Sequence, residues 1–115
     1  MMVYIDTNII MRYLLGDHKE LSEKAKQIID SKTKLFICDG VFAETIYVLT
    51  KVYKVERELV KSTISGLLSK RNIYVNDEKI LIKSLELFTK YHIDYMDSLL
   101  CAYNHTNNIS ELFCT

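Results

Sequence analysis

The chain has 115 residues, of which 49% are hydrophobic, and this size and composition predict a single domain over residues 1–115 with a hydrophobic core. Its 15 basic and 15 acidic residues balance. This balance excludes long-range attraction of nucleic acid by net charge, so any polyanion site must come from a local arrangement of cations or from bound metal. Proline is absent and glycine occurs three times, so no linker rich in these residues divides the chain.

The cysteines and the apolar stretches bear on location. Cys38, Cys101 and Cys114 are odd in number and form no C-x-x-C pair. Each lies in an apolar segment, where we expect a reduced thiol to pack as a small hydrophobic group, and this favours the cytoplasm. The N-terminus does not resemble a secretory signal, and no apolar stretch approaches the ~18 residues that span a bilayer, so we expect no membrane association.

Hydrophobic periodicity predicts short strands that alternate with helices. In chain order we expect a buried strand 2–5, helix 7–15, helix 19–30, a buried strand 35–38, a helix from 39, helix 56–68, strand 73–75, helix 77–91, helix 95–105 and a strand that begins at 112. We expect Thr7 or Asn8 to cap the first helix, Asp39 to cap the third, and Gly16 to end the first. This pattern predicts an α/β fold with three layers, in which helices cover both faces of a parallel sheet of about four strands.

Three acidic residues occur in strongly apolar contexts. Asp6 follows the first strand, Glu44 lies inside the apolar run 41–49, and Asp97 precedes the apolar run 98–103. A buried carboxylate without a partner costs several kcal/mol, so we expect compensation by a cation, by hydrogen bonds or by exposure in a cleft. No basic residue flanks any of them closely, and a divalent metal is the simplest common partner. Ligands of parallel sheets bind beyond the carboxyl ends of the strands, where Asp6 stands.

Each acid also has a purely structural interpretation. Asp6 could cap the helix that follows it, and Glu44 could lie at the solvated edge of a half-buried helix. Asp94 could cap the last helix, with Asp97 in its first turn beside the helix dipole. The conjunction of the three acids is the stronger argument, because all of them could converge at one edge of the sheet.

Three segments carry a family resemblance that covers essentially the whole chain. They are residues 3–10 (VYIDTNII), 43–49 (AETIYVL) and 93–100 (IDYMDSLL). In this order and approximate spacing they resemble the motifs of PIN-domain ribonucleases, most closely the VapC-like toxins of type II toxin–antitoxin pairs. The resemblance implies a PIN-like, Rossmann-like fold and a metal-dependent endoribonuclease that hydrolyses RNA. It also implies a cognate antitoxin that covers the site, and a homodimer.

The resemblance also implies roles for individual residues. Asp6, Glu44 and Asp97 match the acids that bind magnesium or manganese in the family, and we assign them as catalytic residues and metal ligands. Thr7, Asn8 and Asp94 are supporting residues, with Asn8 orienting Asp6. Oxygen ligands favour Mg²⁺ or Mn²⁺, and such ions can lower the pKa of a water for attack on a phosphodiester.

Phosphate contacts are harder to assign than the acids. The candidates on helices or at their ends are Arg12, Lys51, Lys54, Lys70 and Arg71. For each of them a solvated helix face is the ordinary alternative.

The family pattern is incomplete at the C-terminus. A fourth acid usually follows a Thr or Ser at the end of the last strand, whereas this sequence stops at Thr115, so we expect truncation within that motif. The missing acid keeps open an alternative, a non-catalytic PIN-like module that binds RNA or protein. An aspartyl phosphatase or a receiver-like domain would also place Asp6 after a strand, but the phosphatases usually carry a second Asp where Asn8 stands. The metal nuclease accounts better for Glu44.

Overall fold

Strands and helices alternate along the described part of the chain, as the periodicity predicted. The computed structural model describes residues 2–16 and 18–107, with side chains as far as residue 104. The elements are β1 (Met2–Tyr4), α1 (Thr7–Leu15), α2 (Lys19–Ile29), β2 (Lys34–Ile37), α3 (Asp39–Tyr47), the π-helical turn η1 (Val48–Val52), α4 (Arg57–Leu68), β3 (Ile73–Val75), α5 (Glu78–Tyr91) and α6 (Tyr95–Asn107). The strand expected from Leu112 and the expected truncation at Thr115 lie outside the described residues.

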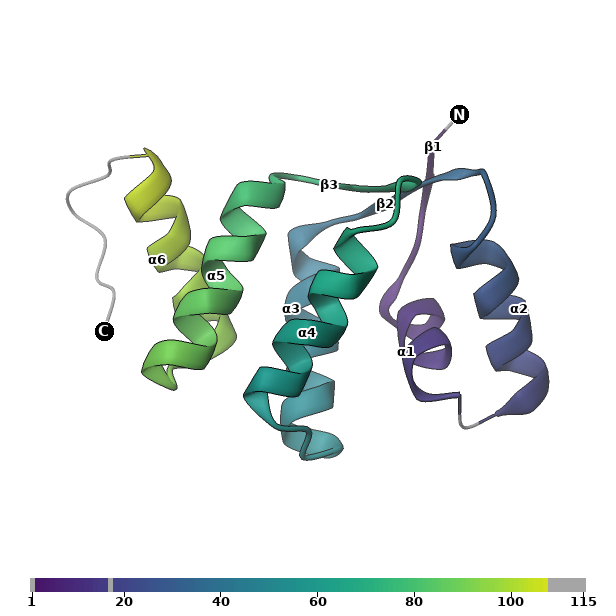
Figure 1. The fold of residues 1–115 in the computed structure, drawn as a ribbon, viewed down its shortest axis with the longest axis horizontal. Coiled ribbons are helices and arrows are strands. Elements are labelled where there is room, and N and C mark those ends of the chain that lie inside the picture. Colours follow the sequence, from purple (N-terminus) through teal and green to yellow (C-terminus); the bar gives the residue numbers. More distant parts are fainter. Residues whose placement is uncertain (1, 17, 108–115) are drawn as a thin grey trace.

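The strands form a parallel sheet in the order β1-β2-β3. Figure 1 shows them along one side of the molecule, with the helices arranged side by side beneath them. Tyr4 pairs with Phe36, and Phe36 pairs with Tyr74, so the strands are in step. Their carboxyl ends therefore meet at a common edge, where the chain continues into Asp6 after β1 and into Asp39 after β2. The prediction of an α/β fold with a parallel sheet flanked by helices is confirmed.

The first strand is more exposed than the sequence predicted. We expected residues 2–5 to form a buried strand, but every residue of β1 is exposed, including Tyr4 at 79%. β1 lies at one edge of the described sheet, and it contacts a neighbouring strand on only one side. The ring of Tyr4 packs on Phe36 of β2, with 5.1 Å between centroids, while the chain buries Ile5 beyond the strand. An apolar sequence alone therefore overestimated burial at this edge.

The helix ends follow the rules of capping, although not always through the residues we expected. Asp6, rather than Thr7 or Asn8, caps α1, and its carboxylate accepts a hydrogen bond of 3.1 Å from the amide of Ile9. Gly16 ends α1 as predicted, with a positive φ of 62° that suits glycine. The expected cap at Asp39 is wrong.

Asp39 is instead the first residue of α3, because Cys38 occupies the cap position without a side-chain hydrogen bond. This leaves the Asp39 carboxylate available for a distant partner.

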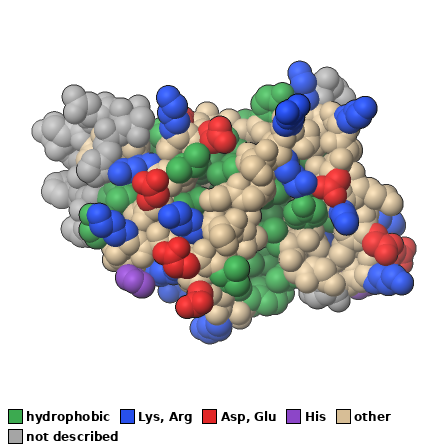
Figure 2. Space-filling model, viewed as in Figure 1, with side chains coloured by type: hydrophobic (Ala, Val, Ile, Leu, Met, Phe, Trp, Pro, Cys, Tyr) green, Lys and Arg blue, Asp and Glu red, His purple; other side chains and the backbone are tan. Residues whose placement is uncertain are grey.

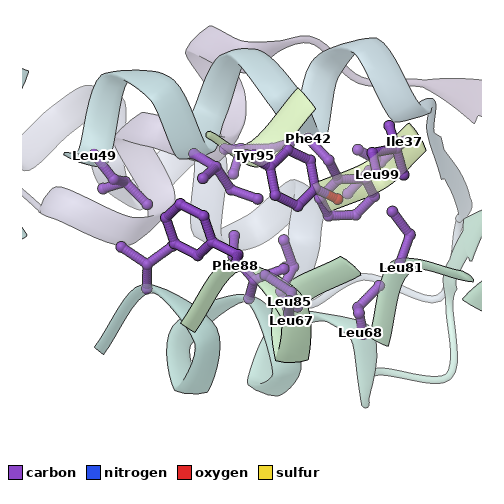
Figure 3. Packing of buried hydrophobic residues seen from close by; sticks show 14 of the residues in the cluster. Ile37, Phe42, Leu49, Leu67, Leu68, Leu81, Leu85, Phe88, Tyr95 and Leu99 are labelled. Atoms are coloured by element: carbon purple, nitrogen blue, oxygen red, sulfur yellow. The ribbon is translucent and has the colours of Figure 1, made fainter. Parts of the chain in front are cut away.

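The core contains buried residues from each described helix and from β2 and β3. Figure 3 shows Phe42, Phe88 and Tyr95 close together, with leucines from several helices around them. The Phe88 and Tyr95 rings meet edge to face at 6.0 Å. Arg57 packs its guanidinium 4.3 Å from the Phe88 ring centroid and donates to the carbonyl oxygens of Phe88 at 2.8 Å and Ile93 at 2.6 Å. These contacts fix α4 against the turn that leads into α6.

The cysteines differ from the expectation that all of them pack as reduced apolar groups. Cys38 is a free thiol but it is exposed, because it lies just beyond β2 at the carboxyl edge of the sheet. Cys101 is buried, as expected. Cys114 lies outside the described residues. The apolar segments therefore predicted burial correctly for Cys101 and wrongly for Cys38.

The surface matches the balanced composition. Figure 2 shows Lys and Arg side chains spread over both halves of the visible face and interleaved with Asp and Glu. No large basic patch is seen on this face, in agreement with the argument from net charge. Among the described helices, none combines the length and the apolar character that crossing a membrane requires.

Candidate active site

Asp6 reaches the carboxyl edge of the sheet through the end of β1. The backbone amide of Ile5 still donates to the carbonyl of Phe36, at 3.1 Å, so the strand geometry continues to the residue before Asp6. Asp6 then turns the chain into α1 by capping it. The carboxylate is exposed, and only one of its oxygens accepts this capping bond. Asp6 therefore has a structural role, and its other oxygen remains accessible to a ligand.

Glu44 lies in the second turn of α3. The helix buries Phe42, Thr45 and Ile46, and this places Glu44 on the opposite, exposed side. Thr45 satisfies its buried hydroxyl by donating to the carbonyl of Val41 at 2.8 Å. The apolar run that surrounds Glu44 in the sequence is thus the buried side of the same helix, and the glutamate itself projects to solvent.

Asp97 lies in the first turn of α6 and is exposed. The carbonyl of Asp94 accepts from the amide of Ser98 at 2.9 Å and from its hydroxyl at 3.1 Å, so the start of this helix is held by backbone and Ser98 bonds. Ser98 is fully buried, whereas Asp94 and Asp97 are both accessible. The interpretation of Asp94 as a residue at the start of the helix fits this geometry.

Exposure, and not a buried partner, is how the fold accommodates the three acids. Asp6, Glu44 and Asp97 are all exposed, although each lies in an apolar stretch of sequence. Exposure in a cleft was one of the three forms of compensation considered. Within the part of the chain that the structure describes, the carboxylates of Glu44 and Asp97 have no hydrogen-bond or ion-pair partner. The fold does not use these two side chains.

Helix α3 connects the regions that carry the acids. It contacts α1, which follows Asp6, and it contacts α6, which carries Asp97. A cavity of about 340 Å³ joins Thr7 and Asn8 to Glu44, and a second, apolar cavity of about 250 Å³ joins Ala43 to Met96, the neighbours of Glu44 and Asp97. The three segments that carry the acids are distant in the sequence, but in the fold two of them lie next to α3, which carries the third.

The acids suit a hard divalent ion by donor type but are not gathered into a ligand set. Carboxylate oxygens are the donors that Mg²⁺ and Mn²⁺ prefer. Among the described residues, however, no group of three or more His, Cys, Asp or Glu side chains is placed to hold a metal ion. The donor chemistry therefore fits, and the arrangement as it stands does not complete the site.

Two of the supporting residues, Thr7 and Asn8, line a cavity together with Glu44. Thr7 is buried, Asn8 is exposed, and both line the cavity that Glu44 also lines. No hydrogen bond joins the side chain of Asn8 to Asp6 among the described residues, so the expected orienting role of Asn8 has no support in the contacts. Asn8 and Thr7 instead form the α1 wall of that cavity.

The candidate phosphate contacts separate into different places. Arg12 lines the cavity beside Glu44, and Lys51 lines the apolar cavity beside Asp94. Lys54 is exposed just after η1 with a positive φ of 55°. Lys70 is occupied by an ion pair of 2.7 Å with Asp30, and its ammonium lies over the Tyr13 ring. Of these candidates, Arg12 shares a cavity with Glu44 and Lys51 shares one with Asp94.

Asp39 also lies at the carboxyl edge of the sheet, and the sequence did not reveal its hydrogen-bond partners. Its backbone amide donates to the side-chain oxygen of Asn76 at 2.9 Å, which links the ends of β2 and β3. The hydroxyl of Tyr103 donates to one carboxylate oxygen of Asp39, and the other oxygen is buried without a hydrogen-bond partner among the described residues. Asp39 follows β2 as Asp6 follows β1, so the same argument from the sheet edge could have found it.

Two tyrosines beside Asp39 hold their protons tightly. The hydrogen bond to Asp39, together with burial, raises the pKa of Tyr103 to about 12. Burial raises the pKa of Tyr95 to about 12, although its 2.8 Å hydrogen bond with the Ser84 hydroxyl acts in the opposite direction. Tyr103, which is bonded to the Asp39 carboxylate, and Tyr95, which is bonded to the Ser84 hydroxyl, therefore both remain neutral at neutral pH.

Comparison with known proteins identifies the family. The model of the PIN domain matches residues 3–114, nearly the whole chain. The chain belongs to the PIN-domain family. This PIN domain is also similar to the VapC ribonuclease of Aquifex aeolicus (strain VF5), with 23% identity over 114 residues that cover 96% of this chain and 84% of the relative. The predicted resemblance to VapC-like PIN domains is confirmed.

Proposed function

We propose that this PIN domain is a divalent-metal-dependent endoribonuclease that hydrolyses RNA phosphodiester bonds, and that it is the toxin of a type II toxin–antitoxin pair. The observation that carries the proposal is the state of Glu44 and Asp97. Glu44 is exposed on α3, and Asp97 is exposed on α6, which contacts α3. Neither carboxylate has a hydrogen-bond or ion-pair partner in the described part of the chain. In a family of nucleases, carboxylates that the fold leaves unpaired are available to the reaction.

We assign the reaction to Asp6, Glu44 and Asp97. These carboxylates would hold Mg²⁺ or Mn²⁺, and such an ion supplies positive charge and a more acidic water when it is bound. Asp6 keeps one oxygen in the cap of α1, so its position is fixed by the helix start, and Glu44 is fixed by the buried face of α3. Arg12 lines the cavity that Glu44 lines, and Lys51 lines the cavity that Asp94 lines. These two cations and Lys54 are the candidates for phosphate contacts.

The partners follow from the same proposal. RNA is the substrate, an antitoxin protein covers the site, and two copies associate as a homodimer in the cytoplasm, each copy acting as one domain. Exposed apolar side chains on α3 and α6, among them Tyr47, Met96 and Leu100, provide surface for a protein partner. Tyr103, also on α6, is half-buried and bonded to Asp39.

The proposal is tested by cleavage of a mixed RNA pool with Mg²⁺ or Mn²⁺. Asp6→Asn is the informative variant, because asparagine caps helices about as well as aspartate and removes only the charge. We expect wild-type cleavage that needs the ion, and a loss of at least about 100-fold in Asp6→Asn. Asp30→Asn is the matched control. Asp30 lies at the C-terminal end of α2, forms an ion pair with Lys70, and lines neither of the two cavities beside the acids. Equal cleavage by wild type and Asp6→Asn would overturn the assignment.

One observation favours the non-catalytic alternative. The described residues contain no group of three side chains placed to hold a metal ion. A PIN-like module that only binds RNA or protein would need no such group. Such a module would bind RNA in the same assay and leave it intact under either ion. A folded chain that binds RNA without cleaving it, also when it is extended beyond Thr115 through the family's last motif, would establish this alternative.

A further inference from the structure

The cavity beside Glu44 has the composition of a site for a flat, partly polar ligand. It measures about 340 Å³, at the small end of the range of about 300–1,000 Å³ that holds small molecules. Met11 and Val48 supply apolar wall, while Asn8, Arg12 and Glu44 supply polar groups. Tyr53 completes the lining. A ligand here would meet an aromatic ring, an apolar wall, an amide and a cation within one small volume.

An irregular helix end positions Tyr53. Beyond α3 the helix widens into the π-turn η1, where the amide of Tyr53 bonds the carbonyl of Val48, five residues back, at 3.1 Å. Lys54 then adopts a positive φ of 55°, a costly conformation for a residue other than glycine, before Val55 donates to the carbonyl of Leu49 at 3.0 Å. π-Turns occur often at functional sites. A positive φ alone does not mark a functional site, because His92 also has one at the end of the regular helix α5. Tyr53 differs because it follows a π-turn and also lines a cavity.

Tyr53 has the exposure of a stacking residue. Its side chain is 48% exposed, and its hydroxyl has no hydrogen-bond partner within the described chain. An unstacked nucleobase gains about 1–3 kcal/mol by stacking on such a ring. The base edges of single-stranded RNA also accept and donate hydrogen bonds, which an asparagine amide can match on both counts.

We propose that this cavity is a nucleobase subsite, in which one unpaired base of single-stranded RNA stacks on Tyr53 while its edge faces Asn8. Arg12 adds positive charge for the phosphate that follows, and Glu44 lies in the wall of the same cavity. The subsite rests on the proposed function for its ligand class, and it deepens that function: it requires single-stranded RNA and places one base directly beside the acids. Duplex RNA, whose bases are stacked inside the helix, would not enter it.

The test measures binding in EDTA, so that it does not depend on cleavage. A fluorescently labelled single-stranded RNA is titrated with the full chain at low salt, and its anisotropy is followed. We expect Tyr53→Ala to raise the Kd about 5- to 150-fold, which corresponds to the stacking range of about 1–3 kcal/mol. Tyr53→Phe keeps the ring and should bind as the wild type does. Tyr91→Ala is the matched control, because Tyr91 is a similarly exposed tyrosine on α5, away from this cavity.

A second probe avoids any variant that fails to fold. An abasic oligonucleotide of the same length keeps the phosphates and lacks the bases, and we expect the wild-type chain to bind it more weakly than RNA. Equal affinity for both probes, or an unchanged Kd for folded Tyr53→Ala, would overturn the subsite.

Cleavage by the wild type separates the two proposals. If the wild type cleaves RNA while binding does not depend on Tyr53, the subsite is wrong and the nuclease stands. If binding depends on Tyr53 and no RNA is cleaved, the subsite stands and the nuclease falls.

Discussion

The described chain contains acids that the fold pairs with other groups and acids that it leaves unpaired. Asp39 is partly buried, its amide bonds Asn76, and its carboxylate receives the hydroxyl of Tyr103. Glu44 and Asp97 are exposed and have no side-chain partner in the described part of the chain. All three occur in apolar stretches of sequence. The comparison teaches that an acid's sequence neighbours do not reveal whether it serves stability or chemistry, whereas its hydrogen-bond partners do.

The largest effect should come from the unpaired acids. We expect Glu44→Gln or Asp97→Asn to lower RNA cleavage by at least about 100-fold, because each removes a charged oxygen from the reaction. Denaturant unfolding should change by less than about 0.5 kcal/mol, as is usual for exposed side chains without partners. Parallel cleavage and unfolding measurements check this. If a variant cleaves normally, or is strongly destabilised, the acid it replaces has a structural role like that of Asp39.

The paired acid should show the reverse pattern. Tyr103→Phe removes the donor to Asp39 and leaves a half-buried carboxylate with one fewer hydrogen bond. We expect a loss of about 1–3 kcal/mol in the free energy of unfolding, typical of a hydrogen bond to a charged group. Cleavage by the folded fraction should be unchanged. A Tyr103→Phe protein of full stability would remove the basis for calling Asp39 structural.

Alkaline pH should weaken the same network. The pKa values of Tyr95 and Tyr103 are raised from 10.0 to about 12, so the native state retains these protons longer than the unfolded chain does. Their contribution to stability is complete below about pH 10, declines as the pH rises, and is lost above about pH 12. Denaturant unfolding between these values should show the decline, and Tyr103→Phe should make it shallower. An equal slope in both proteins would contradict the assignment.

The smallest effect should come from an acid that is paired at the surface. Asp30 forms its 2.7 Å ion pair with Lys70 where both side chains are partly exposed, and hydrogen bonding to Asp30 raises the pKa of Lys70. We expect Asp30→Asn to cost less than about 1 kcal/mol, and added salt to reduce the difference. Unfolding at low and high salt measures it. A cost as large as that of Tyr103→Phe would show that partner type matters less than we infer.

Much of the fold was predictable because it depends on local patterns. Apolar spacing predicted nearly all the described elements to within about two residues at each end, the agreement usual for boundaries. Asp77, at the start of the helix expected over 77–91, caps α5, and Gly16 ends α1 as expected, since these signals act within a few residues. The chain positions of Asp6, Glu44 and Asp97 also came from sequence motifs, and their roles remain a prediction.

The rest required contacts between distant segments. Tyr103 and Asp39 are 64 residues apart in the sequence, and no local sequence pattern predicts the hydrogen bond between them. The exposure of β1 depends on its edge position in the sheet, and the exposure of Glu44 depends on which side of α3 faces the core. The π-turn that positions Tyr53 also lies within a stretch whose apolar spacing predicted an ordinary helix.

The sequence by itself determined the alternation of strands and helices, the family motifs and the identity of the candidate acids. These follow from side-chain periodicity and from residue type, which the order of amino acids contains directly. Only the tertiary structure decided which acids the fold pairs and which it leaves to solvent. That choice depends on packing across long stretches of chain, where burial and hydrogen bonding are settled together.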